Sequence, residues 1–213
     1  GYKRALGKTG YDDNMKYALA AVFLLLFLVS PLIANDNKYK MGCIISSTTS
    51  GRQSYLRRNL LTAMLYGVLA ALIWIVPYAV TISQYYGHGG LVGSLKSIMD
   101  FADFPLNMKL WQYVLLVAVL RTLFIVISAL FMLWVSARCR NTTSAVLINF
   151  AVFALPIIVY ILGAKVMVNV GFSPLLSTNA LLNEPSVIQL IVPISAAFLV
   201  VGDSVIRRIK TSL

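Results

Sequence analysis

Residues 111–135 read WQYVLLVAVLRTLFIVISALFMLWV, and this run decides the class of fold. It is 25 residues long and contains one charged residue, Arg121. Because a helix rises about 1.5 Å per residue, about 20 apolar residues cross a hydrocarbon core that is about 30 Å thick. The run therefore predicts a transmembrane helix.

Four further apolar segments have a similar length, and they cover residues 17–34, 60–83, 145–162 and 187–205. The 213-residue chain is 59% hydrophobic and 12% charged, whereas a soluble domain has about 25% charged residues. A spanning segment must satisfy its own backbone hydrogen bonds, so helices are expected. The sequence predicts an all-α, polytopic transmembrane helix bundle with five spans. Four prolines lie inside these spans or near their ends: Pro31, Pro77, Pro156 and Pro193. Transmembrane helices tolerate such prolines because neighbouring helices satisfy the freed backbone groups.

The formal net charge of +11 comes from basic residues that cluster in short loops beside the apolar segments. In these positions they act as topology signals and contact lipid headgroups. The expected partner of this charge is therefore a lipid bilayer and not nucleic acid. The two cysteines, Cys43 and Cys139, have no metal-ligand or redox spacing, so no metal site and no disulfide scaffold is predicted.

The basic residues also predict an orientation. If five spans alternate, the loops on one side hold Lys96, Lys109 and Lys165, and the other side holds Lys38, Lys40, Arg52, Arg57, Arg58, Arg138, Arg140, Arg207, Arg208 and Lys210. The side with more basic residues faces the cytoplasm, which places the C-terminus and both cysteines there. The basic tail before residue 17 opposes this, and it is discounted because a preceding segment is expected to be missing.

The outer loop at residues 94–104 reads SLKSIMDFADF. One helical stripe of this segment is apolar and the opposite one carries Lys96, Asp100 and Asp103. This pattern is typical of a short helix that lies on the membrane surface. A loop that packs on the helix ends is the equal alternative.

A polar, basic stretch, ISSTTSGRQSYLRRN at residues 45–59, separates the first two apolar segments. At the start of this stretch and just before it, four residues recur at the spacing i, i+3, i+4 and i+7: Met41, Ile44, Ile45 and Thr48. This spacing indicates a short amphipathic helix at the membrane surface. Gly51 permits a sharp turn, and Arg57 and Arg58 can extend to the headgroups. Such a loop offers a polar face to a soluble partner, or it is a solvated topology loop with no partner.

Three groups of residues resemble the ABC-2 permeases, which are the membrane subunits of bacterial type 2 ABC exporters. The first is Ile44-Ile45-Ser46-Ser47-Thr48-Thr49-Ser50-Gly51-Arg52, followed by Tyr55, Leu56, Arg57 and Arg58. The second runs from Phe104-Pro105-Leu106 through Trp111-Gln112-Tyr113 and Arg121 to Ser136-Ala137-Arg138 and Asn141. The third is Leu155-Pro156 with Ser173-Pro174-Leu175. The resemblance covers residues 17–205.

The resemblance implies a permease domain at residues 17–213 with a cytoplasmic coupling loop at residues 35–59. This loop would seat on a separate ATP-binding cassette subunit through Ile44, Ile45, Thr48, Gly51, Arg52, Tyr55, Arg57 and Arg58. The chain has no G-x-x-x-x-G-K-[ST] motif, so ATP and Mg are expected on that partner. A second permease subunit, identical or related, would complete the transporter in the bacterial cell membrane.

Members of this family usually have six spans, and five are recognised in this chain. An N-terminally truncated chain that has lost its first span explains the difference. Residues 1–16 are then an outer tail or the remnant of an outer loop. The family also usually has an acidic residue followed by Lys at the end of its second span, where this chain reads Asn35-Asp36-Asn37-Lys38.

Arg121 lies about ten residues into its span, where an ionisable group costs about 2.5 to 3.5 kcal/mol on insertion scales and faces the protein interior. It is either a contact on a substrate path or a structural group that bonds to neighbouring helices, and the second interpretation is favoured.

Enzymatic chemistry is not expected. The chain contains a single His and a single Glu, which excludes a metalloprotease motif of the H-E-x-x-H type. An ATPase-independent membrane scaffold or a secondary carrier is the alternative to the exporter subunit.

Overall fold

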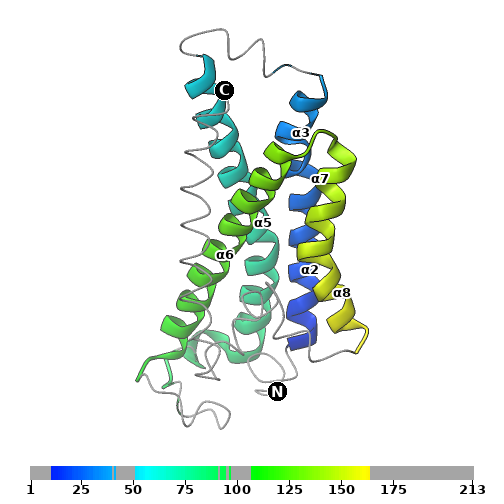
Figure 1. The fold of residues 1–213 in the computed structure, drawn as a ribbon. Helices are drawn as coiled ribbons and strands as arrows, with labels where there is room; N and C mark the ends of the chain where they lie inside the picture. The colour runs from blue at the N-terminus through cyan, green and yellow to red at the C-terminus, as the bar shows by residue number, and fades with distance from the viewer. Residues whose placement is uncertain are drawn as a thin grey trace.

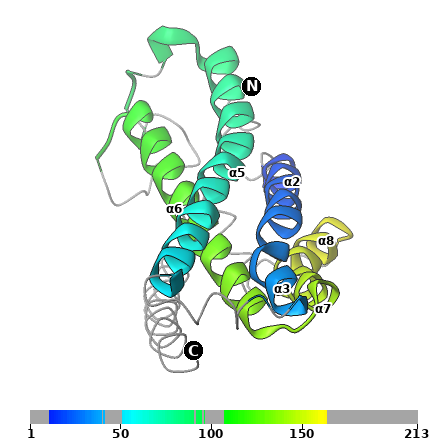
Figure 2. The same ribbon diagram turned by 90° about the horizontal axis from the view of Figure 1, so that it is seen from above.

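The computed structural model describes residues 11–39, 41, 51–90, 92–94, 96 and 107–163, and in these ranges the fold is helical with no strand. The helices are α2 (Tyr11–Val29), α3 (Pro31–Lys38), α5 (Gly51–Gly90), α6 (Leu110–Arg138), α7 (Thr142–Asn149) and α8 (Leu155–Ile161), with a π-helical segment η4 (Phe150–Ala154) between the last two. Figure 1 shows α2, α5 and α6 running between the two ends of a bundle. Seen from above, α5 and α6 cross, and α2, α3, α7 and α8 group beside them (Figure 2).

Four helical stretches are long and apolar enough to cross a membrane. They cover Lys16–Lys38, Arg57–Gln84, Leu110–Arg138 and Thr142–Val159. The four match the first four apolar segments predicted from the sequence. The all-α fold is confirmed in the described residues, and its long apolar helices are consistent with a membrane bundle. The predicted fifth span at 187–205 lies outside them, as do residues 1–10 of the predicted outer tail.

Helix α5 is much longer than the apolar run that predicted it. It contains 40 residues, which correspond to about 60 Å at the rise of an α-helix, and a hydrocarbon core measures about 30 Å. The helix begins at Gly51, nine residues before the predicted start of the span, because residues such as Arg and Gln favour a helix although they are not apolar. Gly51 is the first residue of α5, and residues 42–50 before it lie outside the described ranges. The turn predicted at Gly51 therefore stays a prediction.

The first span is interrupted at Ser30, where α2 ends and Pro31 begins α3. Proline has no backbone N–H and favours the first position of a helix, so the chain starts a new helix there. The fourth span changes to π-helical geometry over Phe150–Ala154, which ends two residues before Pro156. A wider turn relieves the clash between a proline ring and the carbonyl group four residues earlier.

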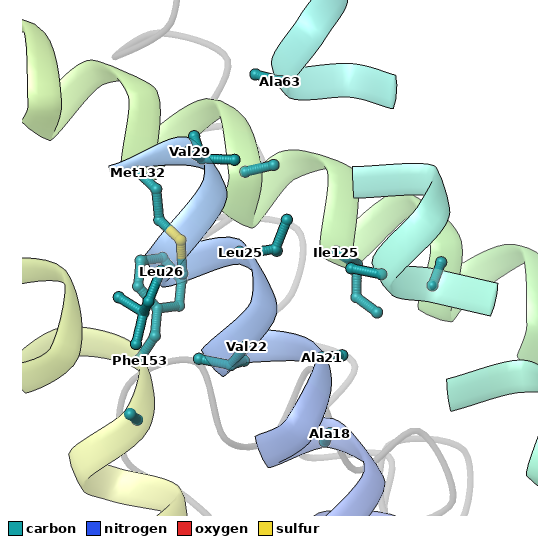
Figure 3. Close-up of a cluster of buried hydrophobic side chains, with 14 of the residues drawn as sticks. Ala18, Ala21, Val22, Leu25, Leu26, Val29, Ala63, Ile125, Met132 and Phe153 are labelled. Carbon is teal, nitrogen blue, oxygen red and sulfur yellow. The ribbon is translucent and has the colours of Figure 1, made fainter. Parts of the chain in front are cut away.

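The core lies where α2 meets α6 and the fourth span. Leu26, Met132 and Phe153 converge there from α2, α6 and η4 (Figure 3), and each is at most 1% exposed. The Phe153 ring also meets the Phe131 ring edge-on at a centroid distance of 5.6 Å. These contacts hold the fourth span against the first and third.

Helices α5 and α6 approach closely because small residues line their contact. A Cβ atom added at Gly67 would lie 3.1 Å from Val126 Cα and 3.4 Å from Ala129 Cβ. Ala63 and Ala71, one helical turn before and after Gly67, are at most 1% exposed. Small residues at this spacing let backbones pack together inside a membrane, where apolar surface alone does not drive association.

The opposite faces of the same helices carry large exposed apolar side chains. On α5 these include Leu65 and Val76, at 58% and 54% exposure, and on α6 they include Leu115 at 56%. A soluble monomer rarely exposes contiguous apolar surface of this extent. The pattern is that of a bundle whose outer surface faces lipid.

Candidate functional site

The first candidate region is the segment that joins α3 to α5. Tyr55 on α5 donates a hydrogen bond from its hydroxyl to Asp36 Oδ2 on α3, at 2.6 Å. The bond links the two helices that flank residues 39–50. Burial of the Tyr55 hydroxyl raises its pKa above the usual 10, and the hydrogen bond to Asp36 and the negative charge of Asp36 raise it further.

The predicted partner contacts fall on both sides of this link. Ile44, Ile45 and Thr48 lie outside the described residues, as does Cys43. Gly51 and Arg52 form the start of α5, and Tyr55, Arg57 and Arg58 follow on the same helix. Arg57 and Arg58 are exposed, and the Arg58 guanidinium lies 5.8 Å from the centre of the Tyr55 ring. The structure thus places five of the eight predicted contacts on one continuous helix.

We expect Tyr55→Phe to lower the free energy of unfolding by about 1 kcal/mol, because a partly buried hydrogen bond to a carboxylate is lost. The raised pKa gives this contribution a pH dependence. A raised folded-state pKa stabilises the protein below the unfolded-state pKa of about 10, and the stabilisation declines as the pH rises above that value. Thermal unfolding in detergent at pH 7 and at pH 11 measures both effects.

The control for this prediction is Tyr39→Phe, since Tyr39 is exposed at the end of α3. This variant should unfold like the wild type at both pH values. If the difference between Tyr55→Phe and the wild type were the same at pH 11 as at pH 7, the Tyr55 hydroxyl would not have the raised pKa that its burial and Asp36 give it.

The second candidate region surrounds Arg121. Its side chain is 1% exposed, and its guanidinium lies 4.6 Å from the centre of the Trp74 ring and 4.2 Å from that of Tyr78. Trp74 and Tyr78 are on α5 and flank Pro77 within that helix. A cation over aromatic faces is stabilised where water is excluded. The contacts of Arg121 with these two rings thus join α6 to α5 beside Pro77.

The Arg121 region fits the structural interpretation made from the sequence, with aromatic faces as its contacts. Nevertheless Trp74 Nε1 and Tyr78 Oη are buried and have no hydrogen-bond partner among the described residues. A shallow hollow of about 350 Å³ lies one turn away between α5 and α6, and it is lined by Ala79, Ile82, Ser83, Trp111, Val114, Leu115 and Ala118. Its lining is almost entirely apolar, so it identifies no polar substrate.

The third candidate region is the break in the first span, which the sequence interpretation missed. The Ser136 hydroxyl on α6 donates to the Ser30 carbonyl oxygen at 2.7 Å and accepts from the backbone N–H groups of Ile33 and Ala34, at 3.3 and 2.9 Å. Pro31 has no N–H to donate to the carbonyl group four residues earlier. A side chain from another helix thus adds hydrogen bonds to the backbone around this interruption.

Asn149, at the end of α7, joins the same cluster. Its Nδ2 donates to Ser30 Oγ at 2.9 Å and to the Met132 carbonyl oxygen at 3.3 Å. Ser30, Ser136 and Asn149 are each fully buried, and we call them the Ser136 junction. The junction fixes three spans to one another. The signal available in the sequence was Pro31 after a serine, together with polar residues inside apolar runs.

Beyond the junction, α3 is also attached to the end of α6. Asn37 Nδ2 donates to the carbonyl oxygens of Ala137 and Cys139 at 3.2 and 3.1 Å, which satisfies acceptors that the end of a helix leaves open. Cys139 is 9% exposed beside Ala34, Val135 and Ala145, and its burial raises the pKa of the thiol. Cys139 is thus a poor site for chemical labelling from either side of a membrane.

Each of the three regions joins helices to one another. In the described part of the chain no three His, Cys, Asp or Glu residues are close enough to hold a metal ion. The first and third regions fix α3 to α5 and to α6 near the Lys38 end of the bundle. Arg121 fixes α6 to α5 closer to the opposite end. Comparison of the chain with protein-family models, with curated proteins and with solved structures gives no significant match.

Proposed function

We propose that this chain is the permease subunit of an ABC-2 type exporter in a bacterial cell membrane, with the Lys38 and Gly51 end of the bundle in the cytoplasm. The observation that carries the proposal is the hydrogen bond between Tyr55 and Asp36. It joins the two helices that flank the segment resembling the coupling loop. Force applied to that segment would therefore reach α3 and α5 together.

The length of α5 supports a mechanical role. Its first six residues precede the membrane span, which begins at Arg57, and the same helix continues across the bundle to Gly90. A partner that binds Arg52 and Tyr55 would thus hold one end of a helix whose other end lies on the far side of the membrane. An ATPase that binds the segment differently with and without ATP would shift the bundle between two arrangements.

The attachments of α3 extend this effect to α6. Asn37 and the backbone N–H groups of Ile33 and Ala34 fix α3 to α6 through hydrogen bonds, the latter two to Ser136 Oγ. Arg121 then holds α6 against the aromatic rings of α5. In this proposal ATP and Mg are bound by a separate ATP-binding cassette subunit, and a second permease subunit completes the pathway. The C-terminus is proposed to be cytoplasmic.

A secondary carrier is the second candidate, and one observation favours it. The first span breaks at Ser30 and the fourth becomes π-helical at Phe150, and these irregular regions meet through the bond from Asn149 to Ser30 Oγ. Carriers use interrupted helices of this kind to form ion and substrate sites. A carrier would transport without an ATPase, so an ATPase assay separates the two functions.

The test is Arg52→Glu in the chain reconstituted with its ATP-binding cassette subunit. Charge reversal at the start of α5 should reduce the ATPase stimulation by the permease about tenfold, a coupling change of about 1.4 kcal/mol. The matched control is Lys96→Glu, an exposed residue at the opposite end, which should leave stimulation unchanged. ATPase activity that is the same with wild type, with both variants and without the chain would contradict the exporter and favour a carrier.

A further inference from the structure

Three of the four spans end in a basic residue at the same end of the bundle. These residues are Lys38, Arg57 and Arg138, each the terminal residue of its candidate span. Arg58 and Arg140 lie close to them in the chain, and all five side chains are exposed. We call these five residues the cationic rim. Figure 1 shows that α3, the start of α5 and the end of α6 lie at one end of the molecule.

Aromatic rings accompany the cations of the rim. The Arg138 guanidinium lies 3.9 Å from the centre of the Trp134 ring. The Lys38 ammonium lies 5.6 Å from that of Tyr39, and Arg58 lies over Tyr55. A ring beneath a cation restricts the positions of the long basic side chain. Tyrosine and tryptophan are also the residues that prefer the headgroup layer of a bilayer.

Within the described part of the chain, the charge of the rim is not neutralised by acidic side chains. Among the described residues, Asp36 is the one acidic residue near this end, and its Oδ2 accepts the Tyr55 hydroxyl. None of the five basic residues forms an ion pair within the described ranges. Five cations thus lie at the depth where the spans leave the hydrocarbon. This is the depth of lipid phosphate groups.

We propose that the cationic rim binds the headgroups of anionic phospholipids. The location at the span ends favours a lipid over a soluble anion, because only a lipid places its phosphate at this depth and its acyl chains against the apolar faces of α5 and α6. Basic residues at a membrane surface attract anionic lipids, and the rings hold these cations in place to make a preferred site. The proposal is independent of any ATP-binding cassette partner.

The experiment is a titration of the purified chain with dioleoyl phosphatidylglycerol or dioleoyl phosphatidylcholine in detergent, with bound lipids counted by native mass spectrometry. The wild type should bind phosphatidylglycerol about tenfold more tightly than phosphatidylcholine. Arg138→Gln/Arg140→Gln should lose most of this preference. Lys96→Gln/Lys109→Gln removes the same charge at the opposite end and should retain it.

Two results would overturn the proposal. One is equal affinity of the wild type for the two lipids, and the other is an equal loss of preference in the arginine and the lysine variants, which would mean unspecific attraction. If Arg138→Gln/Arg140→Gln does not fold, Arg57→Gln/Arg58→Gln tests the same rim from α5. Glycerol 3-phosphate at the lipid concentration should not displace phosphatidylglycerol, and complete displacement would show that the site takes a soluble phosphate instead.

Discussion

Replacement of Gly67 by Leu should destabilise the bundle by about 3 kcal/mol, the largest effect that we expect from a single substitution. A Cβ atom at this position already lies 3.1 Å from the backbone of Val126. Three further carbon atoms would force α5 and α6 apart, with the loss of the stacking of Arg121 on Trp74 and Tyr78. Unfolding in detergent by increasing dodecyl sulfate, followed by circular dichroism, measures the loss.

Two variants calibrate this result. Gly67→Ala adds the Cβ alone, so Val126 must shift by a few tenths of an ångström, and the expected cost is about 1 kcal/mol. Ala20→Leu places a leucine at an exposed position of α2 and should stay within about 0.5 kcal/mol of the wild type. A Gly67→Leu protein that unfolds like Ala20→Leu would show that α5 and α6 are not in contact at this glycine.

Replacement of Ser136 by Ala should cost about 2 kcal/mol, the second largest effect. The substitution removes one buried hydroxyl. The Ser30 carbonyl then loses a hydrogen-bond donor, and the N–H groups of Ile33 and Ala34 lose an acceptor. Buried backbone groups that lose their partner cost about 1 to 3 kcal/mol, although single hydrogen bonds in membrane proteins often contribute less. The same dodecyl sulfate titration measures the loss.

Ser128→Ala is the matched control for Ser136→Ala. Ser128 is buried on the same helix, two turns earlier, and its hydroxyl donates to the Phe124 carbonyl of its own helix at 2.8 Å. That carbonyl can accept the helical N–H as well, so this control should be close to neutral. In addition, Pro31→Ala restores an N–H at the break and should reduce the cost of Ser136→Ala. Equal costs for Ser128→Ala and Ser136→Ala would contradict the role assigned to the junction.

The spans could be predicted from the sequence because hydrophobicity and length together determine which segments cross a membrane. The run at 111–135 became α6, and Arg121 lies within it, about 16 Å along the helix axis from Leu110. The sequence also indicated that Arg121 faces the protein interior, and the structure places it there at 1% exposure. These features depend on each segment alone.

The remaining features depend on pairs of residues far apart in the chain. Ser136 and Ser30 are 106 positions apart in the chain, and Asn149 and Ser30 are 119 apart. No local sequence pattern encodes pairings over such a separation. The start of α5 was missed for a different reason. Residues 51–59 form the first part of α5, but they are mostly polar. A search for apolar segments therefore does not include them. Pro31 and Pro156 marked irregular positions without indicating that one would be a break and the other a π-helical turn.

The most direct test of the membrane topology, on which the proposed function depends, is cysteine accessibility in intact cells. In a background in which Cys43 and Cys139 are serines, single cysteines are introduced at Arg140, in the cationic rim, and at Lys109, at the opposite end of α6. A membrane-impermeant maleimide should label Lys109→Cys in intact cells and Arg140→Cys only after permeabilisation. Labelling of both from outside would contradict a membrane-crossing α6, and the reverse pattern would place the proposed coupling segment outside the cell, where no ATPase subunit can bind it.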